Sequence, residues 1–289
     1  MNSKKLIRRA LCLASAAVLS VGAVAMFAGC TTDRPEITIT YTFNGKDYEV
    51  DYTLSRKSAP QTVQHFIELA DAGYYDGLCI HDYSSSYLYT GGYTYEDGEL
   101  VEKDYFSAVA DLKLTQSVYN VNDEDNPVPL STVYGEFKAN GVSVSGSRYT
   151  HSAGALVMYY TDKGNDATRV ATIRSGNGEM QYNCEYKYNS ATSLFYTFTG
   201  TQNTERDSTY CVFGMASDYN NQMKGDDGLL TAIEEYTSGL GEDQSFTEDV
   251  TMTINRYDPF DSVRNAKLSE TFEVPIEPIV IKSVVVNKY

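Results

Sequence analysis

Tryptophan is absent from this chain, and residue types that build reactive or metal-binding centres are scarce. There are three histidines and five cysteines among 289 residues, and no two cysteines form a CxxC pair. Cys12 and Cys30 lie in the N-terminal segment, and the other three thiols (Cys79, Cys184 and Cys211) cannot all pair with one another. The sequence therefore indicates neither a redox motif nor a zinc site.

Clear metal-ligand spacing is also lacking. The three histidines, His65, His81 and His151, are far apart in the sequence, and each has apolar neighbours. The acidic clusters at 123–125 and 226–227 lack the ligand spacing and the glycine of an EF-hand loop, so we interpret them as solvated turns. We expect no metal and no cofactor.

Positive charge is in short supply. The chain has 23 lysines and arginines against 39 aspartates and glutamates, a formal net charge of −16. Four of the basic residues (Lys4, Lys5, Arg8 and Arg9) lie in the first nine positions, so removal of the N-terminal segment would leave −20. Such an acidic protein is a poor ligand for nucleic acid or for anionic lipid headgroups.

Residues 1–29 have the features of a signal peptide, a basic start followed by a short apolar run. The run ends in Phe27-Ala28-Gly29-Cys30, which resembles the bacterial lipoprotein box. That resemblance implies that Cys30 carries lipid and that residues 30–36 form a tether. We therefore expect a protein anchored to a membrane of the bacterial cell envelope and facing outward. The alternative is an ordinary secretory signal with an incidental cysteine.

The body of the chain is predicted to be mainly β. Its 25 tyrosines suit half-buried strands. Residues 36–43 and 48–54 alternate apolar and polar side chains around Asn44-Gly45, which predicts a hairpin. Residues 58–73 predict a helix that buries one apolar face (Val63, Phe66, Ile67 and Ala70) and ends at Gly73. A second helix is predicted with Asp227 as its cap and Gly239 as its end.

Six stretches in the right order resemble the cyclophilin-type peptidyl-prolyl isomerases. The longest is gap-free and joins the helix SAPQTVQHFIELADAG (58–73) to YYDGLCIHDYSSSYLYTGG (74–92). The others are VYGEF (133–137), HSAGALVM (151–158), NSATSLFY (189–196), CVFG (211–214) and PIVIKSVVV (278–286). The resemblance implies a closed antiparallel β-barrel capped by two α-helices over residues 37–289. Insertions are expected near 93–130, 161–188 and 245–275.

The resemblance also assigns positions to the site, and the polar ones are changed. Asp82 stands where the family places its catalytic arginine, and Thr90 stands where it places a glutamine. The remaining groove positions hold Tyr87, Leu88, Tyr159, Leu194, Tyr196 and Tyr210. These aromatic residues either form a floor on which a prolyl side chain could stack or pack the groove shut.

Two functions follow from these changes. The first is a prolyl isomerase of the cell envelope that acts on proline-containing exported proteins, with activity weak or lost because Asp82 replaces the arginine. The second is a non-catalytic lipoprotein that binds peptide or protein segments in a tyrosine-rich groove. A carbohydrate-binding lipoprotein is a third class, suggested only by abundant tyrosine and acidic residues. In each case we expect a monomer that binds no nucleic acid.

Overall fold

The computed structural model describes residues 32–115, 118–120, 128–129, 131–133, 135–138, 149–159, 168–175, 178–185, 191–202, 210–256 and 266–289. Residues 32–288 form one compact unit. Cys30, with its expected lipid, lies outside the described residues.

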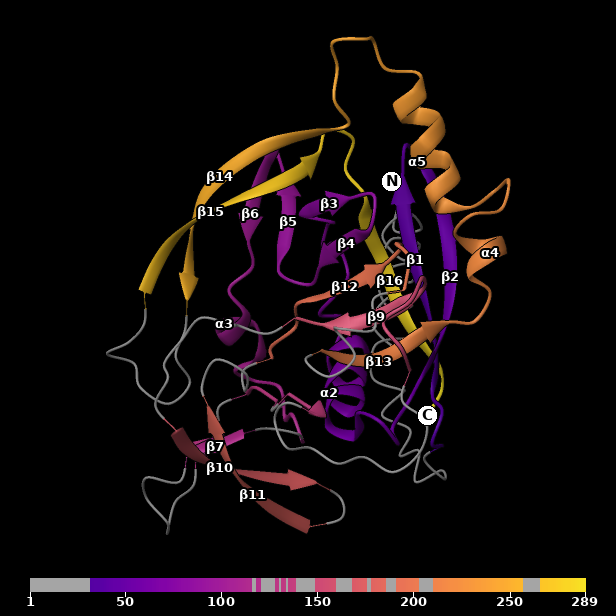
Figure 1. The fold of residues 1–289 in the computed structure, drawn as a ribbon. Helices are drawn as coiled ribbons and strands as arrows, with labels where there is room; N and C mark the ends of the chain where they lie inside the picture. Colours follow the sequence, from indigo (N-terminus) through magenta and orange to yellow (C-terminus); the bar gives the residue numbers. More distant parts are fainter. Residues whose placement is uncertain are drawn as a thin grey trace, which may run out of the picture. The chain divides into compact units, whose positions relative to one another are not determined.

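An antiparallel sheet of eight strands forms the body of this unit, in the order β16-β1-β2-β13-β9-β12-β4-β3 (Figure 1). Its strands are β1 (Glu36–Phe43), β2 (Lys46–Leu54), β3 (Asp82–Ser84), β4 (Tyr87–Thr90), β9 (Ala155–Met158), β12 (Phe195–Phe198), β13 (Cys211–Ala216) and β16 (Val280–Lys288). The predicted hairpin is confirmed, because β1 pairs with β2 along its whole length. Asn44 and Gly45 both have positive φ, as a two-residue hairpin turn requires.

The predicted closure of the barrel needs correction. The ladder of named strands is open, because β16 lies at one edge of the sheet and β3 at the other. Across this gap, Ile80 N–H donates to the carbonyl of Ile279 at 2.8 Å and Ile281 N–H donates to that of Leu78 at 2.7 Å. Cys79 forms an isolated bridge with Val280. A short irregular segment thus occupies the place where a closed barrel would have a full strand pair.

Both predicted helices are present. Helix α2 (Pro60–Asp71) buries Val63, Phe66, Ile67 and Ala70, the predicted face. The ring of Phe66 lies 5.3 Å from that of Phe195 and 5.1 Å from that of Phe213, so α2 packs on the sheet interior. Helix α5 (Leu229–Ser238) follows Gly228 and has no side-chain cap; Asp227 instead pairs with Lys46 at 3.1 Å. Two short helices are α3 (Tyr105–Val109) and α4 (Tyr219–Gln222).

Three further groups of strands lie in the segments where insertions are predicted. They are the hairpin β5 (Tyr93–Glu96) with β6 (Glu99–Glu102), the sheet of β7 (Val118–Asn120), β8 (Val128–Pro129), β10 (Thr168–Ser175) and β11 (Gly178–Glu185), and the hairpin β14 (Thr247–Arg256) with β15 (Ala266–Pro275). That these segments are insertions stays a prediction. The long β14–β15 hairpin arches over β5, β6 and β3 (Figure 1). A small second core, which includes Leu100, Val250 and Val274, joins the two hairpins.

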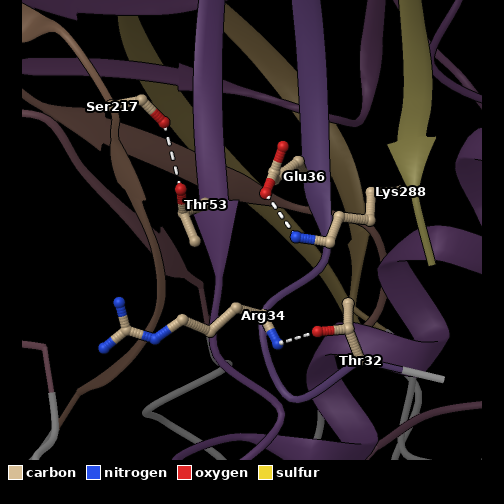
Figure 2. A network of polar contacts seen from close by, with 6 residues as sticks. All are labelled: Thr32, Arg34, Glu36, Thr53, Ser217 and Lys288. Carbon is tan, nitrogen blue, oxygen red and sulfur yellow. Dashed lines mark hydrogen bonds and ion pairs between the residues drawn. The ribbon is translucent and has the colours of Figure 1, made fainter.

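The first and last strands of the sheet are also tied by side chains (Figure 2). Glu36, at the start of β1, forms an ion pair of 2.8 Å with Lys288, at the end of β16. The other strand of the β1–β2 hairpin is linked to the end of β13, because Thr53 on β2 and Ser217 after β13 share a hydrogen bond of 3.0 Å. Arg34 N–H donates to Thr32 Oγ1 at 3.2 Å and forms a turn just before β1. The chain therefore enters the sheet beside the point where it leaves it.

Gly91 allows β4 to approach the segment that leads into β12. Its φ is +99°, and a Cβ placed there would lie 2.2 Å from the carbonyl oxygen of Ser193. Ser193 Oγ also donates a hydrogen bond of 2.6 Å to the Gly91 carbonyl. Only glycine satisfies both constraints, positive φ and close backbone approach.

We predict that Gly91→Ala lowers the free energy of unfolding by about 2 kcal/mol or more, because backbone strain and a steric clash add. Urea unfolding followed by circular dichroism measures the change. Gly98→Ala is the matched control: Gly98 has φ +88° but open space around the missing Cβ, so strain alone should cost about 1 kcal/mol. Equal losses in the two variants would contradict the role of the close approach.

Candidate functional site

The structure divides the predicted site residues between two places. Tyr87, Tyr196 and Tyr210 belong to a cluster of aromatic side chains on β4, β12 and the start of β13. Asp82, Thr90, Tyr159 and Leu194 instead line a cavity of about 840 Å³. Leu88 is buried in the core with 2 % of its surface exposed. Because successive side chains of a strand point to opposite faces, Tyr87 and Leu88 are separated by the sheet itself.

The tyrosine cluster is tightly filled. Tyr196 has no exposed surface, and its hydroxyl shares a hydrogen bond of 2.9 Å with Nε2 of His151. The ring of Tyr87 lies 5.4 Å from that of Tyr196, and the ring of Tyr210 lies 6.4 Å from it. Tyr89, which the sequence did not single out, lies 4.9 Å away. Edge-to-face contacts at these distances favour a packed cluster. Of the two interpretations of these tyrosines, the geometry at Tyr196 favours the filled groove.

Thr90 is occupied by a bond to its own chain. Its side chain is 1 % exposed, and Oγ1 donates a hydrogen bond of 2.8 Å to the carbonyl of Cys79. The bond holds the end of β4 against the segment that precedes β3. Because this hydroxyl donates its proton to Cys79, it does not donate to the backbone of a bound peptide. A glutamine amide, which is longer, would reach such a backbone.

Asp82 is held by the β14–β15 hairpin. Its Oδ1 accepts a hydrogen bond of 3.0 Å from the backbone N–H of Glu273 on β15. Burial raises the pKa of the Asp82 carboxyl above its ordinary value, while the bond from Glu273 lowers it in part. Asp82 is therefore a hydrogen-bond acceptor that links β3 to this hairpin.

The other wall residues of the cavity were not predicted. The ring of His81 lies 4.3 Å from that of Tyr93 and 5.3 Å from that of Phe272, so β5 and β15 each contribute an aromatic side chain. Glu102 and Glu270 reach the same cavity from β6 and β15. All of these residues except His81 lie outside the stretches that resemble the family. His81 lies within such a stretch, but the resemblance assigned it no role. Their proximity arises from the hairpin packing, for which the local sequence has no signal.

Other centres of reactivity are not formed by the residues that the structure describes. Within these residues no three histidine, cysteine, aspartate or glutamate side chains could hold a metal ion. The thiols of Cys79 and Cys211 are buried. Burial raises the pKa of the Cys79 thiol to about 12, so it is neutral and a poor nucleophile. Among the described helices, none has the length and apolar character needed to span a membrane.

The open, curled antiparallel sheet with α2 packed inside it places this chain in the class of cyclophilin-like β proteins. The family model for "Cyclophilin type peptidyl-prolyl cis-trans isomerase/CLD" matches residues 38–253. The chain belongs to this family, and the predicted fold class is confirmed.

Similar solved structures include a cyclophilin-type peptidyl-prolyl cis-trans isomerase from Cryptosporidium parvum. It is 12 % identical, with a TM-score of 0.43, and the match covers 89 % of this chain and 99 % of that one. The same isomerase in the presence of the dipeptide Ala-Pro matches at 13 % identity with a TM-score of 0.42, covering 88 % and 99 % of the two chains. A search of curated protein sequences finds no match.

Asp82 generates a prediction about pH. A carboxyl with a raised pKa in the folded protein binds its proton more tightly there than in the unfolded chain. Its contribution to stability therefore falls as pH rises from the unfolded pKa through the folded one. Asparagine does not ionise and keeps an oxygen that can accept the bond from Glu273. We therefore expect Asp82→Asn to be at least as stable as the wild type at pH 7 and to lose this relative advantage near pH 3.

Urea midpoints at the two pH values measure the difference between the variant and the wild type. Asp249→Asn, at an exposed position on β14, is the control and should show little change at either pH. A destabilisation by Asp82→Asn that is equal at both pH values would show that ionisation of Asp82 is irrelevant to stability.

Proposed function

We propose that this protein binds proline-containing segments of exported proteins at the bacterial cell envelope, and that its isomerase activity is weak or absent. The observation that carries the proposal is the state of Asp82. A carboxylate bonded to the β14–β15 hairpin stands where the family resemblance places a cationic donor. Membership of a prolyl isomerase family supports prolyl peptide segments as the ligand class.

The chemistry explains why Asp82 matters. Rotation about an X–Pro bond has a barrier of about 18–20 kcal/mol, because amide resonance is lost at the transition state. An enzyme accelerates the rotation by binding the twisted amide more tightly than the planar forms. A hydrogen-bond donor near the prolyl nitrogen would do this, whereas an ionised aspartate has no proton to donate and carries the opposite charge.

The second polar contact is missing as well. Thr90 donates to Cys79 within the protein, so it does not orient a substrate backbone. The aromatic residues are retained, but Tyr196 is fully buried and bonded to His151. A binding surface at this cluster would use the partly buried rings of Tyr87, Tyr89 and Tyr210 instead of a deep proline pocket.

We predict that the full-length protein in detergent isomerises a short Xaa-Pro peptide no more than about tenfold faster than the uncatalysed reaction. Exchange spectroscopy by NMR measures the rate. Asp82→Arg should increase this rate because it restores a cationic donor. Asp82→Asn removes the negative charge and adds only a neutral amide, so it serves as the control for the positive charge. A wild-type rate comparable to that of active family members would contradict the proposal.

The lipid anchor can be tested independently. We expect the mature protein to begin at a lipidated Cys30 and to partition into the detergent phase, because buried acyl carbons contribute about 0.8 kcal/mol for each CH₂. Cys30→Ala should remain in the aqueous phase or retain its signal peptide. Mass spectrometry of the N-terminal peptide separates these results. An unmodified Cys30 in a secreted, soluble wild-type protein would favour an ordinary secretory signal.

A further inference from the structure

The cavity beside the tyrosine cluster is built by several separate parts of the chain. It lies between the end of β4, the β5–β6 hairpin, α3, residues 192–195 and the β14–β15 hairpin. At about 840 Å³ it is large enough for several amino-acid side chains. Its charged lining residues are Asp82, Glu102, Asp104, Glu270, Lys103 and Lys267. Carboxylates therefore outnumber ammonium groups.

The aromatic side of the cavity is formed by His81, Tyr93 and Phe272. The ring of Tyr93 lies 4.3 Å from that of His81 and 5.2 Å from that of Phe272. Burial lowers the pKa of His81 to about 3, so the imidazole is neutral at physiological pH. The three rings thus form one aromatic surface that adds no positive charge.

Negative charge converges on this surface from two different strands. Burial is the main cause of a raised pKa of the Tyr93 hydroxyl, and the charges of Glu102 on β6 and Glu270 on β15 raise it further. Glu102 is also the cross-strand partner of Tyr93 in the β5–β6 hairpin, and Glu270 lines the same cavity. An aromatic surface flanked by carboxylates attracts a cation through the ring quadrupole and through direct charge.

The cavity wall already contains one example of this contact. Lys103 Nζ lies 4.2 Å from the centroid of the Tyr74 ring and donates a hydrogen bond of 2.6 Å to the Tyr74 carbonyl. This lysine is held by its own chain. The other basic residue, Lys267, is exposed on β15. Among the described side chains, neither lysine forms an ion pair with Glu270.

Two buried polar atoms on the wall have no hydrogen-bond partner within the part of the chain that the structure describes. They are Nδ1 of His81 and Oγ1 of Thr132, whose residues are 5 % and 1 % exposed. A buried polar atom without a partner carries a free-energy penalty, which a bound polar group relieves. Together with the cavity and its charge, they indicate a site for a ligand that combines polar groups with an apolar body.

We propose that this cavity binds a lysine- or arginine-bearing peptide segment, with the basic side chain against the partly exposed ring of Phe272 and near Glu102 and Glu270. The inference deepens the proposed binding of exported proteins and rests on it, because it specifies which segments are preferred. A basic side chain has the apolar stem and the cationic head that the aromatic and acidic walls match. The strongly acidic chain would also attract basic partners at long range.

The test uses full-length protein in a neutral detergent and pentapeptides of the form fluorophore-Ala-Ala-Xaa-Ala-Ala-NH2, labelled at the N-terminus. Xaa is lysine, norleucine or glutamate, and fluorescence polarisation measures Kd at low and moderate salt. We expect the lysine peptide to bind about tenfold more tightly than the other two, and its affinity to fall with salt. Equal affinity for lysine and norleucine, or no binding of the lysine peptide, would overturn the proposal.

Two variants locate the binding. Glu270→Gln should raise the Kd of the lysine peptide about fivefold. Glu248→Gln removes the same charge from an exposed position on β14 and should change this Kd less than about twofold. Phe272→Leu keeps the apolar bulk but removes the aromatic ring, and should raise the Kd of the lysine peptide about threefold. An equal effect of Glu270→Gln and Glu248→Gln would assign the preference to overall charge and refute the site.

A fourth peptide, with proline as Xaa and no basic residue, separates the two proposals. Its failure to bind contradicts the proposed proline-directed function and leaves the lysine preference standing. Binding of the proline peptide without any preference for lysine over norleucine contradicts the cavity proposal alone.

Discussion

A buried carboxylate holds the helix on which the sheet is packed. Glu136 is 2 % exposed, and its two oxygens accept hydrogen bonds from the backbone N–H groups of Gln61 and Thr62 at 3.1 and 2.8 Å. The first turn of a helix has N–H groups without partners and a partial positive charge, so an anion there is stabilised. Helix α2 has no side-chain cap of its own. Residue 136 therefore fixes α2, and with it Phe66 against β12 and β13.

Two further polar side chains are bonded within the protein, and both bear on the proposed loss of activity. A prolyl isomerase groove needs polar side chains that are available to a substrate. Here the hydroxyl of Thr90 bonds to Cys79, and the carboxyl of Asp82 bonds to Glu273 on the β14–β15 hairpin. Both side chains now stabilise the scaffold. The hairpin that receives Asp82 also packs on β5 and β6 and thereby creates a cavity whose aromatic and acidic walls come from separate segments.

Sequence patterns predicted the elements that depend only on residues close together in the chain. Asn44-Gly45 encodes its turn because positive φ is needed at both positions, and the spacing of Val63, Phe66 and Ile67 encodes the buried face of α2. Two predictions were wrong in detail, namely the closed barrel and the side-chain cap of α5. The gap beside β16 is bridged by an irregular segment, and Asp227 binds Lys46 across the surface in place of capping. Each of these depends on a neighbour that is distant in the sequence.

The sequence by itself determined the family, the hairpin and the two main helices, because these are properties of residue types in a fixed order. It also predicted that the family's polar site residues are replaced. Only the tertiary structure decided what the replacements do. Tyr196 became a fully buried ring bonded to His151, and Asp82 became the anchor of a hairpin encoded almost two hundred residues later. The charge and shape of the cavity likewise follow from long-range packing, which no local pattern carries.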